Sequence, residues 1–522
     1  MKHLYKITFI VVSMLFVINV FGQRYVLIDS DNANPTDIYP EIMGDTNTDG
    51  SRVDNNTIYQ LKNGMVYLCG GTLINAPEWA LQIEAENLNN TETKPLITRK
   101  PNDAGSYSQM FNTYGDFSLT NLWVILGDQG AGIDLSWGSI RFFGENSTIK
   151  MTNCIMEKDR GAVVQCRAAG MKIYVTGCHI RNGVQIGPFT GNGRFVDTRN
   201  FHVDSLVVKR CYIYDMTDRI FRSMGSSQPH NYVEFDHNTI FRQSGHHGCF
   251  QFETVKTLKI TNNLLVNPLA NGTTPANTTE QTQPDNEAHK VFTIDSIIDG
   301  IDYTFEANNI FWDQGLLDYY ASNDTVSPVN VYSDLLVEVL GGETAADETY
   351  ISERVVLTNT PTQDIAFLIK GYYENVGATP EEMLAIPITL QVEDIGYAGT
   401  PYDYGFLFDY SEFDGGYTPG SESATGATDG SAIGVWAGPT GIFDNQTQRS
   451  SLSLFPNPAS NGFVTIELEE EAAAIVYVYD VTGKQVMQAS VEGKLVKLNV
   501  SDLTKGVYIV NVNNAVQKLI IK

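Results

Sequence analysis

The chain has 522 residues, which is more than a single ordinary domain needs. Its formal net charge of −27 argues against general binding to nucleic acids or anionic membranes, because like charges repel. We therefore expect no nucleic-acid partner, and we expect the protein to be a monomer.

The first residues predict export. Two lysines precede an apolar run over 7–20, which Phe21-Gly22-Gln23 closes. This pattern is typical of a secretory signal peptide, here over 1–22, and the run is too short to span a membrane. Because no other stretch reaches the length of a spanning segment, we expect an exported protein with no membrane span.

Residues 24–114 are expected to form the first units of the stack described next. Thr57–Leu61 and Met65–Leu68 flank Lys62-Asn63-Gly64, which predicts a hairpin-like turn. The segment Asp45–Gly50 resembles the start of a calcium loop, but its twelfth position is Asn56 where an EF-hand has Glu. An EF-hand is therefore not expected. Ca²⁺ stays open as a cofactor, and no residue is assigned as a metal ligand.

Six segments of similar sequence define the middle of the chain. Each has apolar third and fifth positions, and this period-2 alternation predicts a strand. The segments start at Ser147, Met171, Asp204, Asn231, Lys256 and Ile301, and a weaker seventh starts at Gly115. Their eighth positions are Cys154, Cys178, Cys211, Asn238, Asn263 and Asn308. A constant pattern within each segment, combined with variable distances between segments, is typical of a stacked repeat in which insertions form loops.

A strand, a tight turn and a second strand make one coil of a parallel β-helix. A single coil cannot bury its inner residues, so the neighbouring coils above and below complete the core. Asn at the eighth position is expected to hydrogen-bond its equivalent in the next coil, and Cys there is a small apolar filler. We expect these cysteines to stay unpaired, with a disulfide between adjacent coils as the alternative. Over roughly 24–313 the pattern resembles the right-handed β-helix of the pectate-lyase-like superfamily.

The C-terminal third divides into two parts. The acidic stretch over about 314–440 is interpreted as late coils and a cap that complete a β-helix unit over 23–440, although Ser421–Ser431 has the composition of a loop or linker. Residues 441–522 contain Ser453–Pro458, Val476–Lys484 and Leu503–Tyr508, motifs that resemble the C-terminal sorting domain of the type IX secretion system. The fold expected is all-β: a right-handed parallel β-helix, or solenoid, followed by a small β-sandwich. The resemblance implies the type IX machinery as a partner and a secreted or surface-attached protein.

Positive charge gathers in one window. Residues 134–260 contain 16 of the 34 Lys and Arg against 11 Asp and Glu, a net charge of +5, so the rest of the chain carries −32. Six of the eight histidines lie there too. A basic island on an acidic exported protein suggests a site for an anionic ligand. The alternative is that charged outer faces of the coils cluster there without a ligand.

Another short strand precedes five of the repeats, at 139–143, 162–167, 219–224, 249–253 and 290–294. Their apolar residues point inward, so the outward residues are Arg141, Gln165 or Arg167, Arg219 or Arg222, Gln251 or Glu253, and Lys290. Coils stack about 4.8 Å apart, which predicts a groove of guanidinium groups suited to carboxylates or sulfates. We assign Arg141, Arg167, Arg219 and Gln251 to substrate binding.

The superfamily resemblance implies a chemistry. Its polysaccharide lyases cleave acidic sugars by β-elimination, with a base and a group that neutralises the uronate carboxylate. The base candidates are His246 and His247, in the loop before one outward strand, and Lys209. Arg222 is assigned to neutralise the carboxylate. The chain has no close match to the acidic Ca²⁺ cluster of typical pectate lyases, to the Lys and Arg motifs of the chondroitinase and alginate lyase branch, or to the paired aspartates of polygalacturonases.

Two functions follow from these observations. The first is a secreted lyase-like protein that acts on uronate-containing or sulfated polysaccharide. The second is a non-catalytic β-helix that binds glycans at the cell surface, as an adhesin does. The titratable cluster in the basic island favours the first, and the missing lyase motifs favour the second.

Overall fold

The computed structural model describes residues 23–88, 92–100, 109–126, 140–157, 159, 161–183, 192–216, 218–243, 248–270, 272, 290–322, 328–359, 414–417, 420–435 and most of 453–522, with gaps at 456, 458, 460–461, 468–472, 481–484, 494, 502 and 513–514. The chain divides into two compact units with a boundary between Gly438 and Pro439. The first unit is a right-handed parallel β-helix with three long sheets, as the sequence predicted.

Sheet 1 is the stack of predicted repeats. Its ten parallel strands are β1 (Arg24–Ile28), β3 (Thr57–Leu61), β6 (Leu81–Ala85), β9 (Phe117–Thr120), β12 (Thr148–Thr152), β15 (Met171–Thr176), β18 (Val203–Lys209), β21 (His230–Asp236), β24 (Val255–Thr261) and β27 (Asp302–Glu306). The third positions of successive repeats pair with one another, as in Ile149 with Ile173 and Leu206 with Val233. The predicted register of these six strands is therefore confirmed.

Sheet 2 follows sheet 1 in each coil. Its eleven strands are β2 (Thr36–Asp37), β4 (Val66–Cys69), β7 (Leu96–Arg99), β10 (Trp123–Ile125), β13 (Ile155–Glu157), β16 (His179–Gly183), β19 (Tyr212–Met216), β22 (Thr239–Gln243), β25 (Leu264–Val266), β28 (Asn308–Phe311) and β30 (Tyr350–Ile351). The predicted hairpin around Lys62-Asn63-Gly64 is wrong, since β3 and β4 belong to different sheets and do not pair. That turn instead carries the chain from sheet 1 to sheet 2.

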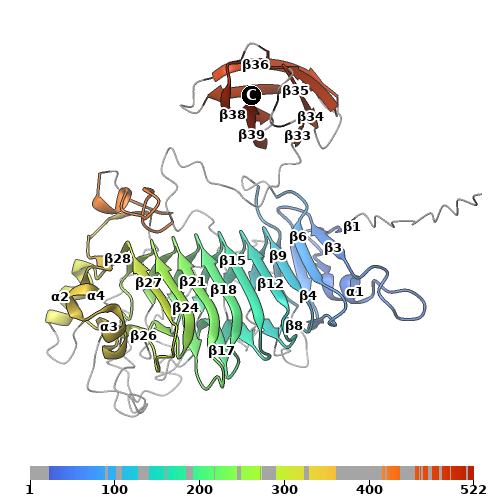
Figure 1. Ribbon diagram of the computed structural model, residues 1–522. Coiled ribbons are helices and arrows are strands. Elements are labelled where there is room, and N and C mark those ends of the chain that lie inside the picture. The colour runs from blue at the N-terminus through green and yellow to red at the C-terminus, as the bar shows by residue number, and fades with distance from the viewer. Residues whose placement is uncertain are drawn as a thin grey trace, which may run out of the picture. The chain divides into compact units, whose positions relative to one another are not determined.

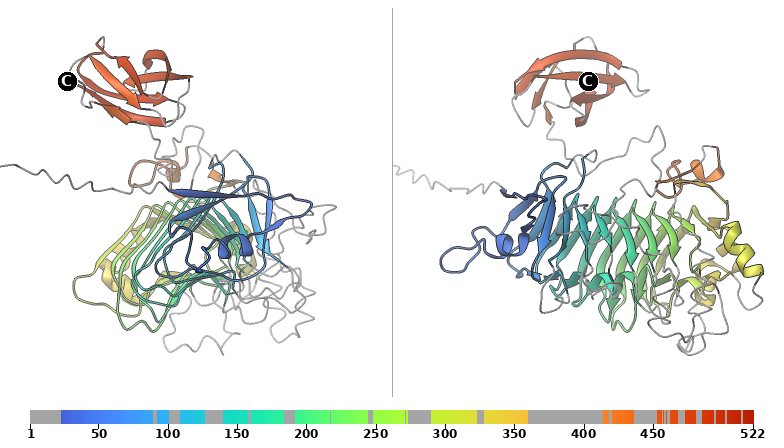
Figure 2. Two further views of the ribbon diagram at one scale, coloured as in Figure 1. Left: turned by 90° about the vertical axis from the view of Figure 1, so that its right-hand side faces the viewer. Right: turned by 180° about the vertical axis from the view of Figure 1, so that it is seen from behind.

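Sheet 3 precedes sheet 1 in each coil. Its nine strands are β5 (Leu73–Ile74), β8 (Phe111–Thr113), β11 (Ile140–Phe142), β14 (Ala162–Cys166), β17 (Arg194–Arg199), β20 (Phe221–Ser223), β23 (Phe250–Gln251), β26 (Lys290–Thr293) and β29 (Asn330–Tyr332). Figure 2 (left) looks along the stack from its N-terminal end, where the coils surround a shared interior. The interior face of sheet 3 stacks Phe250 on Phe292, with ring centroids 5.0 Å apart.

The turn between sheets 1 and 2 contains the predicted ladder. Six eighth-position residues are buried in one column: Cys154, Cys178, Cys211, Asn238, Asn263 and Asn308. The Oδ1 of each asparagine accepts the backbone N–H of the previous member, at 2.9 Å from Cys211 and 3.0 Å from Asn238. All six cysteines are buried, and none of them forms a disulfide. The amide ladder and the expectation that the column cysteines form no disulfide are thus confirmed.

Helices close both ends of the stack. At the N-terminal end, α1 (Ile38–Met43) buries Ile38 and Ile42 in the core. At the other end lie α2 (Gln314–Ala321), α3 (Asp334–Leu340) and α4 (Glu343–Asp347), between the last strands of sheets 2 and 3. Leu336 of α3 is fully buried and belongs to the same core. A helix over the last coil removes an apolar end and an open sheet edge from water.

After β30 the chain turns back along the outside of sheet 2. This segment contains β31 (Leu357–Asn359), β32 (Asp414–Tyr417) and the 3-10 helix η1 (Glu422–Ala424). Its Ile433 packs with Phe241 and Val266 on the outward face of sheet 2. The backbone N–H of Gly434 donates to the carbonyl of Asn262 at 2.7 Å. Residues 420–435 are therefore a docked layer of the β-helix, whereas their composition had suggested a linker.

The second unit is a small β-sandwich, as predicted. One sheet contains β33 (Ser453–Phe455), β34 (Phe463–Glu467) and β37 (Leu495–Asn499); the other contains β36 (Gln485–Glu492), β35 (Ala473–Asp480), β38 (Gly506–Val512) and β39 (Ala515–Ile521). Both sheets are antiparallel. Val464 and Ile466, the apolar members of an alternating strand, are fully buried between them with Val478 and Val510.

Candidate functional site

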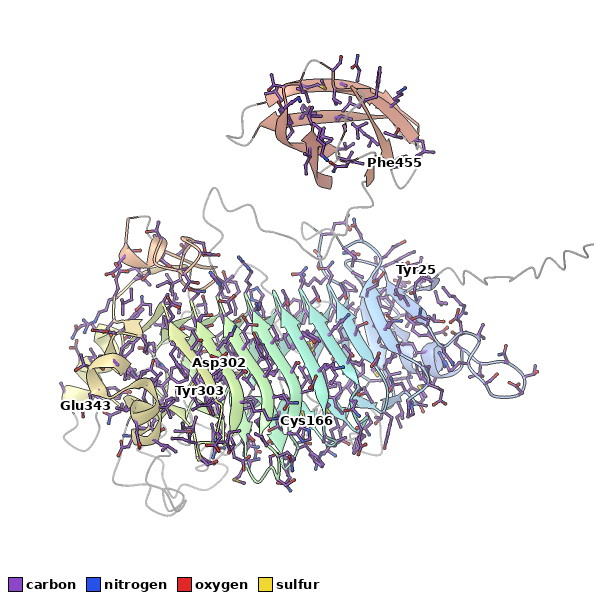
Figure 3. All side chains as sticks on the ribbon, viewed as in Figure 1. Tyr25, Cys166, Asp302, Tyr303, Glu343 and Phe455 are labelled. Carbon is purple, nitrogen blue, oxygen red and sulfur yellow. The ribbon has the colours of Figure 1, made fainter. Side chains whose placement is uncertain are left out.

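The outward face of sheet 3 carries one column of polar side chains. Register places Arg141 beside Gln165, Gln165 beside Asp197, Asp197 beside Arg222, and Arg222 beside Gln251. Cys166, which follows Gln165 at the end of β14, is labelled in Figure 3. Among the alternatives left by the sequence, the column contains Gln165, Arg222 and Gln251.

Asp197 is the centre of this column. It is fully buried, and its carboxylate accepts from Nη1 of Arg222 at 3.2 Å and from Nη1 of Arg194 at 3.1 Å. The Nε of Arg199 lies 3.6 Å from the same carboxylate. Burial lowers the pKa of Arg222, while the charge of Asp197 opposes that change. One aspartate thus holds three guanidinium groups on sheet 3.

A second aspartate extends the network. Asp218 accepts from Nε of Arg194 at 2.6 Å and from Nη1 of Arg219 at 3.2 Å. Arg194 therefore bridges Asp197 and Asp218. Burial lowers the pKa of Arg219 to about 10, although Asp218 beside it favours the charged form. The predicted substrate-binding Arg219 lies within this network, two residues before β20.

Arg141 and Arg167 add further positive charge. Burial lowers the pKa of Arg141, and repulsion from Arg167 and Arg199 adds to the effect. Arg167 follows β14 and donates through Nε to Oε1 of Gln165 at 3.1 Å. The four predicted arginines of the groove, at 141, 167, 219 and 222, therefore meet on sheet 3.

We call this cluster the arginine face. Its members are Arg141, Arg167, Arg194, Arg199, Arg219 and Arg222, with Asp159, Asp197 and Asp218. Six arginines against three aspartates leave a formal excess of three positive charges among these residues. Several of its polar atoms are buried without a hydrogen-bond partner in the described structure: Nε of Arg141, Arg219 and Arg222, and Oε1 of Gln251. Buried polar atoms are normally paired, so these three donors and one acceptor each have an unused capacity for a hydrogen bond.

The predicted bases lie elsewhere or cannot be placed. Lys209 is the last residue of β18 on sheet 1, and its Nζ lies 2.9 Å from a carboxylate oxygen of Glu234. The outward phase of a sheet 1 strand points it away from sheet 3, so its placement differs from the prediction. His246 and His247 lie outside the described residues.

Sequence reasoning missed the carboxylates that organise the face. The strand β17, which supplies Arg194, Asp197 and Arg199, was not among the five strands predicted to precede the repeats. Its sequence Arg-Phe-Val-Asp places opposite charges three residues apart around an apolar pair, which is the one signal that could have identified it.

In the segment that resembles a calcium loop, the carboxylate of Asp45 is bound by other side chains of the protein. Asp45 accepts from Nη2 of Arg24 at 3.0 Å and from the hydroxyl of Tyr59 at 2.8 Å, and Arg52 lies 3.7 Å away. Arginine contacts lower the pKa of Asp45. In the part of the chain that the structure describes, no group of three His, Cys, Asp or Glu residues is arranged to hold a metal ion.

Comparison with known proteins identifies the second unit. Residues 453–522 match the family described as "Secretion system C-terminal sorting domain". No curated protein matches the chain. Within the described residues, no helix has the length and apolar character that crossing a membrane requires. The type IX sorting tail marks the chain as a secreted or cell-surface attached protein.

Proposed function

We propose that this protein binds acidic polysaccharide along the arginine face and cleaves it by β-elimination. The observation that carries the proposal is the excess of arginine on one sheet, with three buried Nε donors that no described residue satisfies. Planar guanidinium groups pair with carboxylates and sulfates in a bidentate way. The fold itself resembles the β-helix of pectate-lyase-like proteins, which supports this class of substrate.

The chemistry would proceed at one uronate unit. Arg222 would pair with its carboxylate, and this neutralisation would acidify the neighbouring C5 proton. Arg141, three strands away in the column, would bind another unit of the polysaccharide. A base then removes that proton, and the C4–O bond to the next sugar breaks as the C4=C5 double bond forms. His246 and His247 remain base candidates from the sequence.

A second candidate function is binding without cleavage. One observation favours it: Arg194 and Arg222 are held by Asp197, and Lys209 is held by Glu234 on another sheet. A face whose charges are already paired can recognise a glycan without supplying a base. Incubation with pectin, alginate, glycosaminoglycans and sulfated algal glycans separates the two functions. New ultraviolet-absorbing unsaturated ends support the lyase, whereas binding with no product on any glycan supports the adhesin.

Arg222→Ala is expected to weaken binding of an acidic glycan by roughly tenfold to a hundredfold, because a hydrogen bond to a charged group contributes about 1.5–3 kcal/mol. Affinity of the wild type should also fall as salt rises. Titration calorimetry at two salt concentrations measures both effects. Lys256→Ala is the matched control, since it removes one exposed positive charge from sheet 1. Equal losses in both variants would point to net charge rather than to the arginine face.

The secreted protein is expected to begin near Gln23 and to lack most of 450–522, because signal peptides and sorting tails are removed during export. Intact mass spectrometry of the protein recovered from the medium tests both ends. A released form that retains Leu454–Lys522 would contradict removal of the tail.

A further inference from the structure

A hydrogen-bonded serine, histidine and aspartate lie together at the turn between sheets 1 and 2. The Nδ1 of His237 is 3.0 Å from Oδ1 of Asp236, and its Nε2 is 3.0 Å from Oγ of Ser431. Because a carboxylate only accepts, Nδ1 carries the proton. Nε2 is then free to accept from the Ser431 hydroxyl. These are the roles of the three groups in a nucleophilic Ser-His-Asp triad.

The fold builds this arrangement from distant parts of the chain. Asp236 ends β21, and His237 follows in the left-handed region with φ 52°. Ser431 belongs to the layer over 420–435 that docks on sheet 2, 194 residues further on. Asn262 links the two parts, since its Nδ2 donates to Asp236 at 2.8 Å and its Oδ1 accepts from the N–H of Thr428 at 2.8 Å.

Each group has the environment that its role needs. His237 is buried at 4% exposure, whereas Ser431 is exposed and accessible to substrate. Thr261 and Asn262 also donate to Asp236, and despite burial these bonds and His237 lower the pKa of Asp236 to about 2. The aspartate therefore remains a carboxylate that fixes the tautomer and orientation of the imidazole.

The backbone N–H that follows Ser431 is the candidate donor for a developing oxyanion. The backbone N–H of Ala432, directly after Ser431, makes no hydrogen bond with any part of the described structure. In many acyl-transfer enzymes the N–H after the nucleophile stabilises the tetrahedral intermediate. Asp429 lies 3.6 Å from Nε2 and accepts from the N–H of Ser431 at 2.9 Å. Hydrogen bonds from the side chain and the N–H of Ser431 lower the pKa of Asp429, and the charges of His237 and Arg210 add to this effect. Lys209 lies 4.0 Å from Asp236.

We propose that Ser431, His237 and Asp236 form a second site that hydrolyses carboxylic esters, independent of the arginine face on sheet 3. Ser431 Oγ forms a bond to the ester carbonyl carbon while its proton passes to Nε2. As the C–O bond to the alcohol breaks, Nε2 returns that proton to the departing oxygen. Water then attacks the acyl-serine by the same route, which releases the acid and restores Ser431. An exposed serine suits esters that project from a large molecule, such as O-acyl groups on a glycan.

The chain contains its own control for this site. Asp49-Gly50-Ser51 repeats the tripeptide Asp429-Gly430-Ser431 and makes the same turn, with the serine N–H donating to the aspartate at 2.9 Å. Ser51 is also exposed, and its Oγ donates to Asp49 at 2.6 Å, but no histidine of the described structure is bonded to it, whereas Ser431 contacts His237. The hydroxyl of Ser51 therefore lacks the histidine that would activate it.

A fluorophosphonate probe on the full-length protein, followed by peptide mass spectrometry, tests the proposal. We expect an adduct on Ser431 at least tenfold faster than on Ser51. Hydrolysis of p-nitrophenyl acetate should be lost in Ser431→Ala and kept in Ser51→Ala. Asp236 is a positioning residue, so Asp236→Asn should slow labelling and change its pH profile.

Equal labelling of Ser431 and Ser51, or no labelling of Ser431, would overturn the proposal and leave Ser431 as a latch for the docked layer. This comparison uses the wild-type protein alone, so it holds even if a variant fails to fold. The outcome is also separate from that of the glycan experiments, because no residue of the arginine face takes part.

Discussion

Replacing Asp197 with alanine is expected to lower the free energy of unfolding of the β-helix by about 3–5 kcal/mol, because removal of one partner leaves a buried charge uncompensated. Asp197 is fully buried and contacts Arg194, Arg199 and Arg222. Its loss would place these guanidinium groups side by side with one carboxylate fewer. Chemical denaturation followed by circular dichroism measures the change.

Two further variants identify the cause. Asp302→Ala is the control, since Asp302 is an exposed residue of β27, labelled in Figure 3, and its loss should change stability by less than about 0.5 kcal/mol. Asp197→Asn keeps the shape but removes the charge, so it should cost nearly as much as alanine. If Asp197→Ala changes stability by less than 1 kcal/mol, the arginines are not held by this carboxylate.

Asp197 also affects glycan binding, because it positions Arg222. A loss of glycan affinity in Asp197→Ala would reflect disorder of Arg222 as much as loss of charge, so Arg222→Ala remains the direct test of the arginine face. This coupling is typical of functional sites built on ion-pair networks, where the residues that bind also stabilise.

The parts of the fold that repeat could be predicted from the sequence. Sheet 1 alternates apolar and polar residues, and Asn238, Asn263 and Asn308 recur at one position, so both register and ladder follow from local pattern. The docked layer could not be predicted in this way. Ile433 packs on Phe241 across almost two hundred residues, and no period links them. The polar composition of Ser421–Ser431 even favoured the opposite interpretation.

In the candidate sites, too, residues on repeating strands could be predicted from the sequence and residues brought together by distant segments could not. Arg141 and Arg222 could be placed because each alternates with apolar residues on a short strand. Asp197 could not, because its strand was not recognised. Lys209 was predicted from charge alone, and charge does not specify which sheet a residue faces. His237 belonged to the histidine cluster of the basic island, but only the docked layer brings Ser431 to it.

Replacing Asn263 with leucine is expected to destabilise the β-helix by about 3 kcal/mol or more, because each buried polar group left without a partner costs about 1–3 kcal/mol. Asn263 accepts from the N–H of Asn238 at 3.0 Å and donates to the carbonyl of Phe235 at 2.8 Å and to Oδ1 of Asn308 at 3.0 Å. Leucine satisfies none of these groups, and its branched end does not fit a column that thiols and amides fill. Cys178→Ala, in the same column, is the control and should cost less, since its thiol makes weak bonds, accepting from the N–H of Cys154 at 3.3 Å and donating to the carbonyl of Thr176 at 3.5 Å. Thermal and urea unfolding compare the two variants. Equal, small losses would mean that the column is held by burial alone, whereas the predicted difference would show that the amides keep successive coils in register.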